Sequence, residues 1–250
     1  MSLLVQVVGA TLMIGAALVA GEGFPGGAPL VLSILAGVCG VVGIVSLYQG
    51  LAVGRMGVVA PVTGVLATSA PVVVGIVLDG APPTIVAVGI GLALVAVVLV
   101  SRAPAVGDRR SGIEYALLAG VGIGGFDVFF GLVPEGFVFW PLVVLKVTAA
   151  AVIVTVAVVG RRAWRIPRPV TPAVVGVAIA DMAGNGFYLL AAQAGALAIA
   201  SVLSALYPVV TVLLAAVLLR ERISGGHAVG IAAAIVAIVL IGSGSAIPTG

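Results

Sequence analysis

Residues 178–204 read AIADMAGNGFYLLAAQAGALAIASVLS, and this stretch decides how the rest of the chain is interpreted. Most of its side chains are apolar enough to lie within a lipid bilayer, yet it contains Asp181, Asn185 and Tyr188. A carboxylate is costly to place in hydrocarbon, so such a group normally faces a cavity or a polar partner. The stretch therefore predicts a membrane protein in which Asp181 and its neighbours line a central site for a small molecule.

The overall composition excludes a soluble domain of ordinary size. Of the 250 residues, 62% are hydrophobic and 8% are charged, and the mean hydropathy is +1.40. Soluble domains have about a quarter of their residues charged. The single cysteine, Cys39, and the single histidine, His227, exclude an internal disulfide and a metal site built on Cys/His spacing. The arginines are spread over short connections and form no basic face, so we expect no nucleic acid partner.

The apolar runs predict about nine transmembrane helices with short connections. A spanning helix needs about 20 mostly apolar residues. Lipid offers the backbone no hydrogen-bond partner, and runs of this length favour helices over strands. The expected spans are residues 2–20, 30–50, 56–78, 83–101, 113–133, 137–160, 171–192, 196–219 and 226–245. We therefore expect an all-α polytopic membrane protein.

The distribution of arginine predicts the orientation in the membrane. Alternate connections, the second, fourth, sixth and eighth, contain all of the arginines. These are Arg55, Arg102, Arg109, Arg110, Arg161, Arg162, Arg165, Arg168, Arg220 and Arg222. The other connections contain acidic Glu22, Asp79 and Glu135 and no Lys or Arg. The positive-inside rule then places the arginine side in the cytoplasm of a cell-membrane protein.

The sequence also contains an internal repeat. Val88–Val100 reads VGIGLALVAVVLV and Val229–Ile241 reads VGIAAAIVAIVLI, a separation of 141 positions. Tyr48 and Tyr188 correspond at a separation of 140. A unit with an odd number of helices places its second copy inverted in the membrane, with the substrate site between the copies. We expect repeats at residues 1–111 and 112–250.

The two predicted repeats differ in their number of helices. The second begins near Gly112 and has five predicted helices, whereas the first has four. Subtracting the repeat separation places the start of the missing helix before Met1. We expect that the first repeat lacks its first helix, through a start codon assigned too late or through a real deletion.

Three ionisable residues lie well inside predicted spans, namely Asp127, Lys146 and Asp181. At about 1.5 Å per residue, Asp127 and Lys146 are both about 20 Å from the arginine side, and Asp181 is about 14 Å from it. The short connection at residues 134–136 makes the fifth and sixth spans neighbours. We therefore predict a buried Asp127–Lys146 ion pair, which either locks two helices together or takes part in transport.

Asp181 then has no lysine partner and is the expected proton or cation site. Its alternative role is that of a hydrogen-bonded carboxyl that packs helices together. Asn185 and Tyr188 share its helical face because they follow at positions four and seven. The residues expected to line the cavity with it are Asn185, Tyr188, Tyr48, Gln49 and Tyr207. Tyrosine is also common as an anchor at membrane interfaces, which is the alternative for Tyr48 and Tyr188.

The second repeat resembles a known family. Residues 179–195 read IADMAGNGFYLLAAQAG, and residues 201–224 read SVLSALYPVVTVLLAAVLLRERIS, with a Glu-Arg pair at 221–222. These segments resemble the EamA-type drug/metabolite transporters. Residues 47–83 of the first repeat read LYQGLAVGRMGVVAPVTGVLATSAPVVVGIVLDGAPP, where Asp79-Gly80 replaces the Glu-Arg pair. The resemblance implies ten helices in two inverted five-helix repeats around a central cavity, and ATP-independent transport.

We therefore expect a secondary-active transporter that exports small organic metabolites, amino acids or drugs by alternating access. Its partners would be the small-molecule substrate, the lipid bilayer and a coupling proton. No cofactor, metal site or catalytic constellation is predicted. The alternative is a membrane assembly partner without transport activity, or a truncated and inactive transporter.

Overall fold

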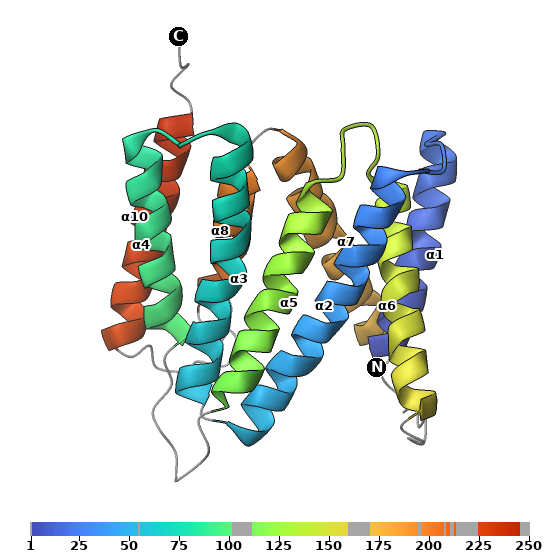
Figure 1. Cartoon of the computed structure of the whole chain (residues 1–250), viewed down its shortest axis with the longest axis horizontal. Helices are drawn as coiled ribbons and strands as arrows, with labels where there is room; N and C mark the ends of the chain where they lie inside the picture. Colours follow the sequence, from blue (N-terminus) through green and yellow to red (C-terminus); the bar gives the residue numbers. More distant parts are fainter. Residues whose placement is uncertain are drawn as a thin grey trace. The chain divides into compact units, whose positions relative to one another are not determined.

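The computed structural model describes residues 2–54, 56–101, 112–159, 171–194, 197–207, 209–210, 213 and 225–245. The regular elements within these ranges are α-helices (Figure 1). They are α1 (Ser2–Ala20), α2 (Ala28–Val53), α3 (Met56–Asp79), α4 (Thr84–Ser101), α5 (Ile113–Gly131), α6 (Phe139–Val159), α7 (Thr171–Gln193), α8 (Leu197–Ser204) and α10 (Gly225–Ser245).

The described helices confirm an all-α polytopic membrane protein. Six of them, α1, α2, α3, α5, α6 and α7, contain an apolar stretch of at least 18 residues that is long enough to cross a membrane. Helices α4 and α10 contain the shorter apolar stretches Thr84–Val100 and Ala228–Ile241. Most of the eighth predicted span beyond α8 lies outside the described residues, as do the arginines and the Glu221-Arg222 pair. The predicted orientation therefore stays a prediction.

Short connections with glycine at positive φ separate the helices. Gly80 follows α3 with φ 87°, and Gly136 lies between α5 and α6 with φ 90°. Residues with a Cβ rarely adopt this backbone region, so glycine allows the chain to reverse within a few residues. The tight α5–α6 turn predicted from Pro134-Glu135-Gly136 is present.

The chain forms two compact units, each of which we describe by itself. Unit 1 comprises Met1–Val41 and Gly125–Gly195, and unit 2 comprises Val42–Gly124 and Ala196–Gly250. Each unit takes helices from both predicted repeats, and α2 and α5 contribute residues to both units. The predicted repeat boundary near residue 112 stays a prediction.

In unit 1, α1 packs against both α6 and α7, and α6 contacts α7 (Figure 1). Small residues bring these helices close together. A Cβ at Gly37 of α2 would lie 2.8 Å from Cβ of Thr148 on α6. A Cβ at Gly9 of α1 would lie 3.3 Å from the Met182 sulfur on α7. Close approach of this kind is how helices associate in lipid, where apolar burial supplies little driving force.

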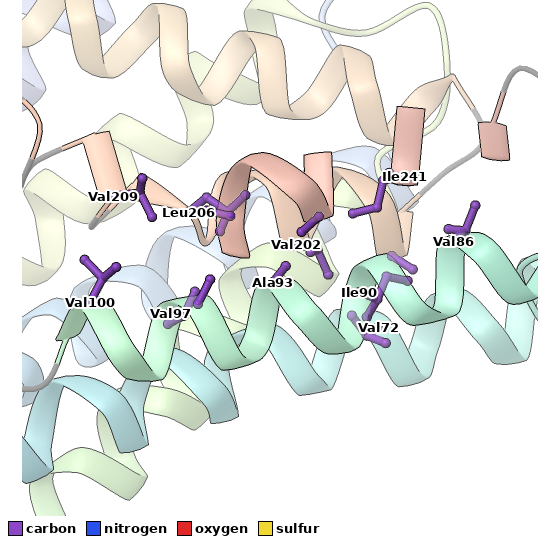
Figure 2. Packing of buried hydrophobic residues seen from close by; sticks show 14 of the residues in the cluster. Val72, Val86, Ile90, Ala93, Val97, Val100, Val202, Leu206, Val209 and Ile241 are labelled. Atoms are coloured by element: carbon purple, nitrogen blue, oxygen red, sulfur yellow. The ribbon is translucent and has the colours of Figure 1, made fainter. Parts of the chain in front are cut away.

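Unit 2 is built around the contact between α4 and α10, with α3 packed against α4 and α8. Buried valine, leucine, isoleucine and alanine side chains from these helices form one cluster (Figure 2). Val97 and Val202 are each almost fully buried in this cluster. These side chains come from α3, α4, α8, α10 and the residues just after α8, so unit 2 has a packed apolar interior of its own.

The α4–α10 contact is antiparallel and reciprocal. A Cβ at Gly89 of α4 would meet Ile241 of α10, and a Cβ at Gly230 of α10 would meet Val100 of α4. Gly89 and Gly230 are 141 positions apart, as are Val100 and Ile241. Between these ends, four almost fully buried alanines line the two helices: Ala93, Ala96, Ala234 and Ala237. Reciprocal contacts of this kind are expected where a two-fold axis relates two helices.

We predict that Gly89→Val and Gly230→Val each destabilise the protein by about 1–3 kcal/mol, because overpacking a close contact forces the helices apart. A Cβ would lie 2.8 Å from Ile241 Cγ1 at Gly89 and 2.6 Å from Val100 Cγ2 at Gly230. Thermal unfolding in detergent measures the change. Gly91→Val is the matched control, since no heavy atom lies within 4 Å of its added Cβ. An equal loss in all three variants would contradict the assigned contact.

Candidate functional site

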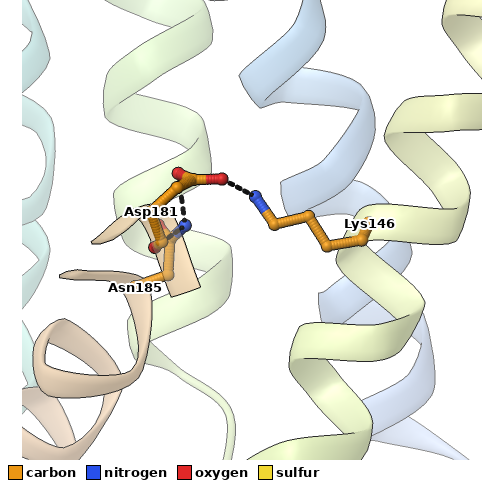
Figure 3. Close-up of polar contacts among 3 residues, drawn as sticks. All are labelled: Lys146, Asp181 and Asn185. Carbon is orange, nitrogen blue, oxygen red and sulfur yellow. Dashed lines mark hydrogen bonds and ion pairs between the residues drawn. The ribbon is translucent and has the colours of Figure 1, made fainter. Parts of the chain in front are cut away.

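An ion pair lies inside unit 1, between two helices that are expected to span the membrane. The ammonium Nζ of Lys146 on α6 lies 2.5 Å from carboxylate Oδ2 of Asp181 on α7 (Figure 3). Lys146 follows the first residue of α6 by about two turns, and Asp181 lies near the middle of α7. The pair therefore places two charges away from the helix ends, where a lone charge would be costly.

Asn185 completes the polar contacts of the Asp181 carboxylate. Its Nδ2 donates to Asp181 Oδ1 at 3.0 Å and to the Asp181 backbone carbonyl at 2.9 Å. Asn185 can do this because it follows Asp181 by four positions and lies on the same face of α7. One carboxylate oxygen thus accepts from lysine and the other from asparagine, which fixes the orientation of the acid (Figure 3).

The two charged side chains differ in their exposure. The Lys146 side chain is 5% exposed and the Asp181 side chain is 37% exposed. The buried lysine depends on the acid for its compensating charge, because an unpaired buried ammonium is strongly unfavourable. The acid, by contrast, can be approached from its open side. The ammonium has three N–H donors, and within the described residues Asp181 is the partner that accepts from it.

The predicted Asp127–Lys146 ion pair was wrong, because Lys146 pairs with Asp181. Depth along the helices suggested Asp127, but the direction in which each residue points from its helix decides the pairing. The flexible four-carbon stem of lysine spans a difference in depth of several ångströms. Asp127, on the part of α5 that belongs to unit 1, is half-buried. Its carboxylate has no hydrogen bond or ion pair in the described part of the chain.

Tyr188 lies close to Asp127 and joins α5 to α7. Its hydroxyl donates to the Asp127 backbone carbonyl at 2.7 Å. Its ring stacks at centroid distances of 6.5 Å and 6.4 Å from the rings of Phe126 and Phe130. The residue is 7% exposed. The structure therefore places Tyr188 in helix packing beside the site, and a direct contact with substrate stays a prediction.

The remaining predicted site residues belong to unit 2. Tyr48 on α2 is 66% exposed, Gln49 beside it is also exposed, and Tyr207 is 59% exposed. The structure therefore collects Lys146, Asp181 and Asn185 into one cluster and leaves these three outside unit 1. Their role in a cavity stays a prediction.

A comparison with protein-family models matches residues 110–243 to the EamA-like transporter family. This match covers more than half of the chain. The chain belongs to the EamA-like transporter family. The match includes Lys146, Asp181 and Asn185, so the ion-pair cluster lies within the family segment. Members of this family are transporters, and membership is consistent with a protein that is not an enzyme.

A protein of known crystal structure shares the fold of this EamA-like chain. The TM-score is 0.75 at 19% sequence identity, and the match covers 99% of this chain and 88% of the other. No curated protein matches the sequence. The structural match supports the helical fold but does not identify the substrate of this EamA-like protein.

Sequence reasoning gave no role to Gln6, a polar residue of α1 in unit 1. Its side-chain oxygen Oε1 is buried and has no hydrogen-bond partner within the described residues. Gln6 lies 140 positions before Lys146, so the repeat separation would have pointed to it. Helix α1 packs against both helices that hold the ion pair. A buried acceptor without a partner is unfavourable unless a donor reaches it, so Gln6 is a further candidate contact of this EamA-like protein.

The described residues offer no obvious metal centre. Across those ranges, no group of three or more His, Cys, Asp or Glu side chains is close enough to hold a metal ion. The cluster of this EamA-like chain itself presents an ammonium, a carboxylate and an amide group.

A double-mutant cycle tests which acid is the partner of Lys146. We predict that Lys146→Met and Asp181→Leu each destabilise the protein by about 1.5–3 kcal/mol, since each leaves a charge without its partner. The double variant should lose less than the sum of the two. Unfolding of purified protein measures the coupling. Asp127→Leu combined with Lys146→Met is the matched control and should be additive. Coupling to Asp127 in place of Asp181 would contradict the structure.

Proposed function

We propose that the chain is a secondary-active transporter of small organic solutes and that the Lys146–Asp181–Asn185 cluster binds the solute. Membership of the EamA-like family supports a transporter. The supporting observation in the structure is an ion pair within unit 1, between the buried Lys146 and the partly exposed Asp181 on two helices long enough to cross a membrane. Intramembrane ionisable residues commonly mark substrate or ion pathways.

The chemistry of the cluster favours a zwitterionic solute, such as an amino-acid-like metabolite. The partly exposed Asp181 carboxylate offers acceptors to a solute ammonium group, and Lys146 offers N–H donors to a solute carboxylate. A solute that carries both groups replaces each half of the ion pair with a new charged partner. A solute with one charge would leave one protein charge buried and unpaired, which is unfavourable.

The same exchange keeps the net charge of the site constant. Without solute, Lys146 and Asp181 neutralise each other, so the empty site carries no net charge from this pair. With a zwitterion, the net charge is again unchanged. Alternating access then requires that the site opens to one side at a time, as in inverted-repeat transporters. The reciprocal α4–α10 contact supports such a repeat in this chain.

We assign the coupling proton to Asp127. Lys146 already neutralises Asp181, whereas the half-buried Asp127 carboxyl has no ion pair among the described residues. A carboxyl of this kind can bind a proton on one side of the membrane and release it on the other. We take export as the direction from the family resemblance, and we place the arginine connections in the cytoplasm of a cell membrane by the positive-inside rule.

Proteoliposome transport tests this function. Purified protein is reconstituted, a pH gradient is imposed, and a pool of metabolites is analysed by mass spectrometry. We predict that the wild type moves one or more zwitterions and that Lys146→Met reduces this at least about tenfold, the cost of one lost ionic contact. Asp127→Asn should keep solute exchange without a gradient but lose the response to pH. Gly91→Ala, with open space at its Cβ, is the control.

Zwitterion transport by Lys146→Met at the wild-type rate would contradict the proposed site. Movement of uncharged solutes alone would contradict the proposed substrate class. A pH response that survives in Asp127→Asn would exclude Asp127 as the coupling residue.

A further inference from the structure

The turn between α5 and α6 in unit 1 is bonded on both sides by residues from distant parts of the chain. This turn comprises residues 132–138. Glu22, which follows α1, accepts hydrogen bonds from backbone N–H groups at the start of α6. Gln193, the last residue of α7, donates to backbone carbonyls of the turn. We call these two contacts together the turn clamp.

The Glu22 half of the clamp satisfies donors at the start of α6. One carboxylate oxygen accepts from the backbone N–H groups of Val138 and Phe139, each at 3.0 Å. The other accepts from the N–H of Trp140 at 2.8 Å. The first N–H groups of a helix have no partner within the helix, and a carboxylate there also interacts favourably with the helix dipole.

The Trp140 side chain joins the same contact. Its indole Nε1 donates to the Glu22 backbone carbonyl at 2.7 Å. Its ring meets the Phe24 ring edge-on, with centroids 5.1 Å apart at an angle of 73°. The connection after α1 is thus attached to α6 through both backbone and side-chain groups.

The Gln193 half satisfies acceptors of the turn. Its Nε2 lies 3.0 Å from the carbonyl oxygens of Pro134 and Phe137 and 3.3 Å from that of Val133. These carbonyls belong to the turn after α5, and a buried backbone carbonyl needs a donor of this kind. Glu22 therefore bonds the last residue of the turn and the first two residues of α6, and Gln193 bonds three carbonyls of the turn.

We propose that Glu22 and Gln193 are positioning residues: the turn clamp fixes α6 against α1 and α7 and so holds Lys146 at Asp181. Lys146 follows Phe139, the first residue of α6, by about 10 Å along the helix axis. The clamp joins α6 to α7, and these are the two helices that carry the charges of the ion pair. The ends of α1, α6 and α7 at this turn stay together as one rigid piece while the site opens to one side of the membrane or the other. The rigidity of the turn end during transport rests on the proposed function, whereas the positioning of Lys146 does not.

Chemical labelling tests the positioning role without any transport measurement. Lys146 is the single lysine of the sequence, so an amine-acylating reagent followed by mass spectrometry reports on it alone apart from the chain's amino terminus. We expect Glu22→Gln and Gln193→Leu to raise the acylation rate of Lys146 at least fivefold, and Glu22→Gln to raise amide exchange at residues 138–140 at least tenfold. Glu135→Gln, an exposed acid of the same turn, is the matched control and should change neither rate.

The two labelling readouts separate the outcomes. Faster exchange at residues 138–140 with unchanged Lys146 acylation would overturn the positioning role and leave Glu22 as a helix cap. Unchanged exchange in Glu22→Gln would overturn the clamp itself. Glu22→Asp tests for rescue, and an acylation rate closer to wild type than that of Glu22→Gln is expected.

Cross-linking tests whether the clamp stays closed during transport. Phe24→Cys and Trp140→Cys are combined in a Cys39→Ala background and joined by a short bifunctional thiol reagent. We expect the cross-linked protein to transport solute at no less than half the rate of the uncross-linked protein. Loss of transport that is regained when the linker is cleaved would overturn the closed clamp. If the uncross-linked wild type moves no solute, the proposed function fails, while the labelling result still decides the positioning role.

Discussion

The placement of two charges within apolar helices is the constraint on which the rest of unit 1 depends. Lys146 is almost completely buried, and Asp181 supplies the opposite charge within ion-pair distance. Asn185 then orients the acid from the same helix. An ion pair is weak evidence for stability, since its desolvation cost rivals its Coulombic gain. We therefore propose that this ion pair serves function and that the exposed side of Asp181 is the ligand's route to it.

Close packing through small residues provides the scaffold around this pair. In lipid there is little hydrophobic drive between helices, so contact depends on van der Waals fit and on satisfied polar groups. Unit 2 uses glycine and alanine where α4 crosses α10, and its contacts repeat reciprocally. Unit 1 adds polar contacts at its turn end, where Glu22 and Gln193 satisfy backbone groups that the helices leave open. Helix packing therefore depends on small residues in unit 2, and in unit 1 it also depends on polar contacts at the turn end.

Helices could be predicted from the sequence with good accuracy, because uninterrupted apolar runs are long and glycine marks their ends. The importance of Lys146 and Asp181 could also be predicted, since intramembrane charges are rare. Their pairing could not, because depth along a helix says nothing about rotation around its axis, and Asp127 lies at a similar depth to Lys146. Gln6 was missed as a neutral side chain in an apolar run, although the repeat separation relates it to Lys146. The sequence shows Glu22 only as an acidic residue in a connection, and its bonds to α6 reveal its role.

The claim that Lys146 and Asp181 together bind a zwitterionic solute is tested most directly by equilibrium binding. A pool of radiolabelled amino acids is offered to purified wild type and to the doubly neutral variant Lys146→Met with Asp181→Leu, each shown to be folded by its unfolding temperature. We predict that the wild type binds at least one zwitterion and that the neutral variant binds it at least about 100-fold more weakly, the loss expected for two charged contacts. Equal affinity of the two proteins for that solute would show that the ion pair is not the binding site.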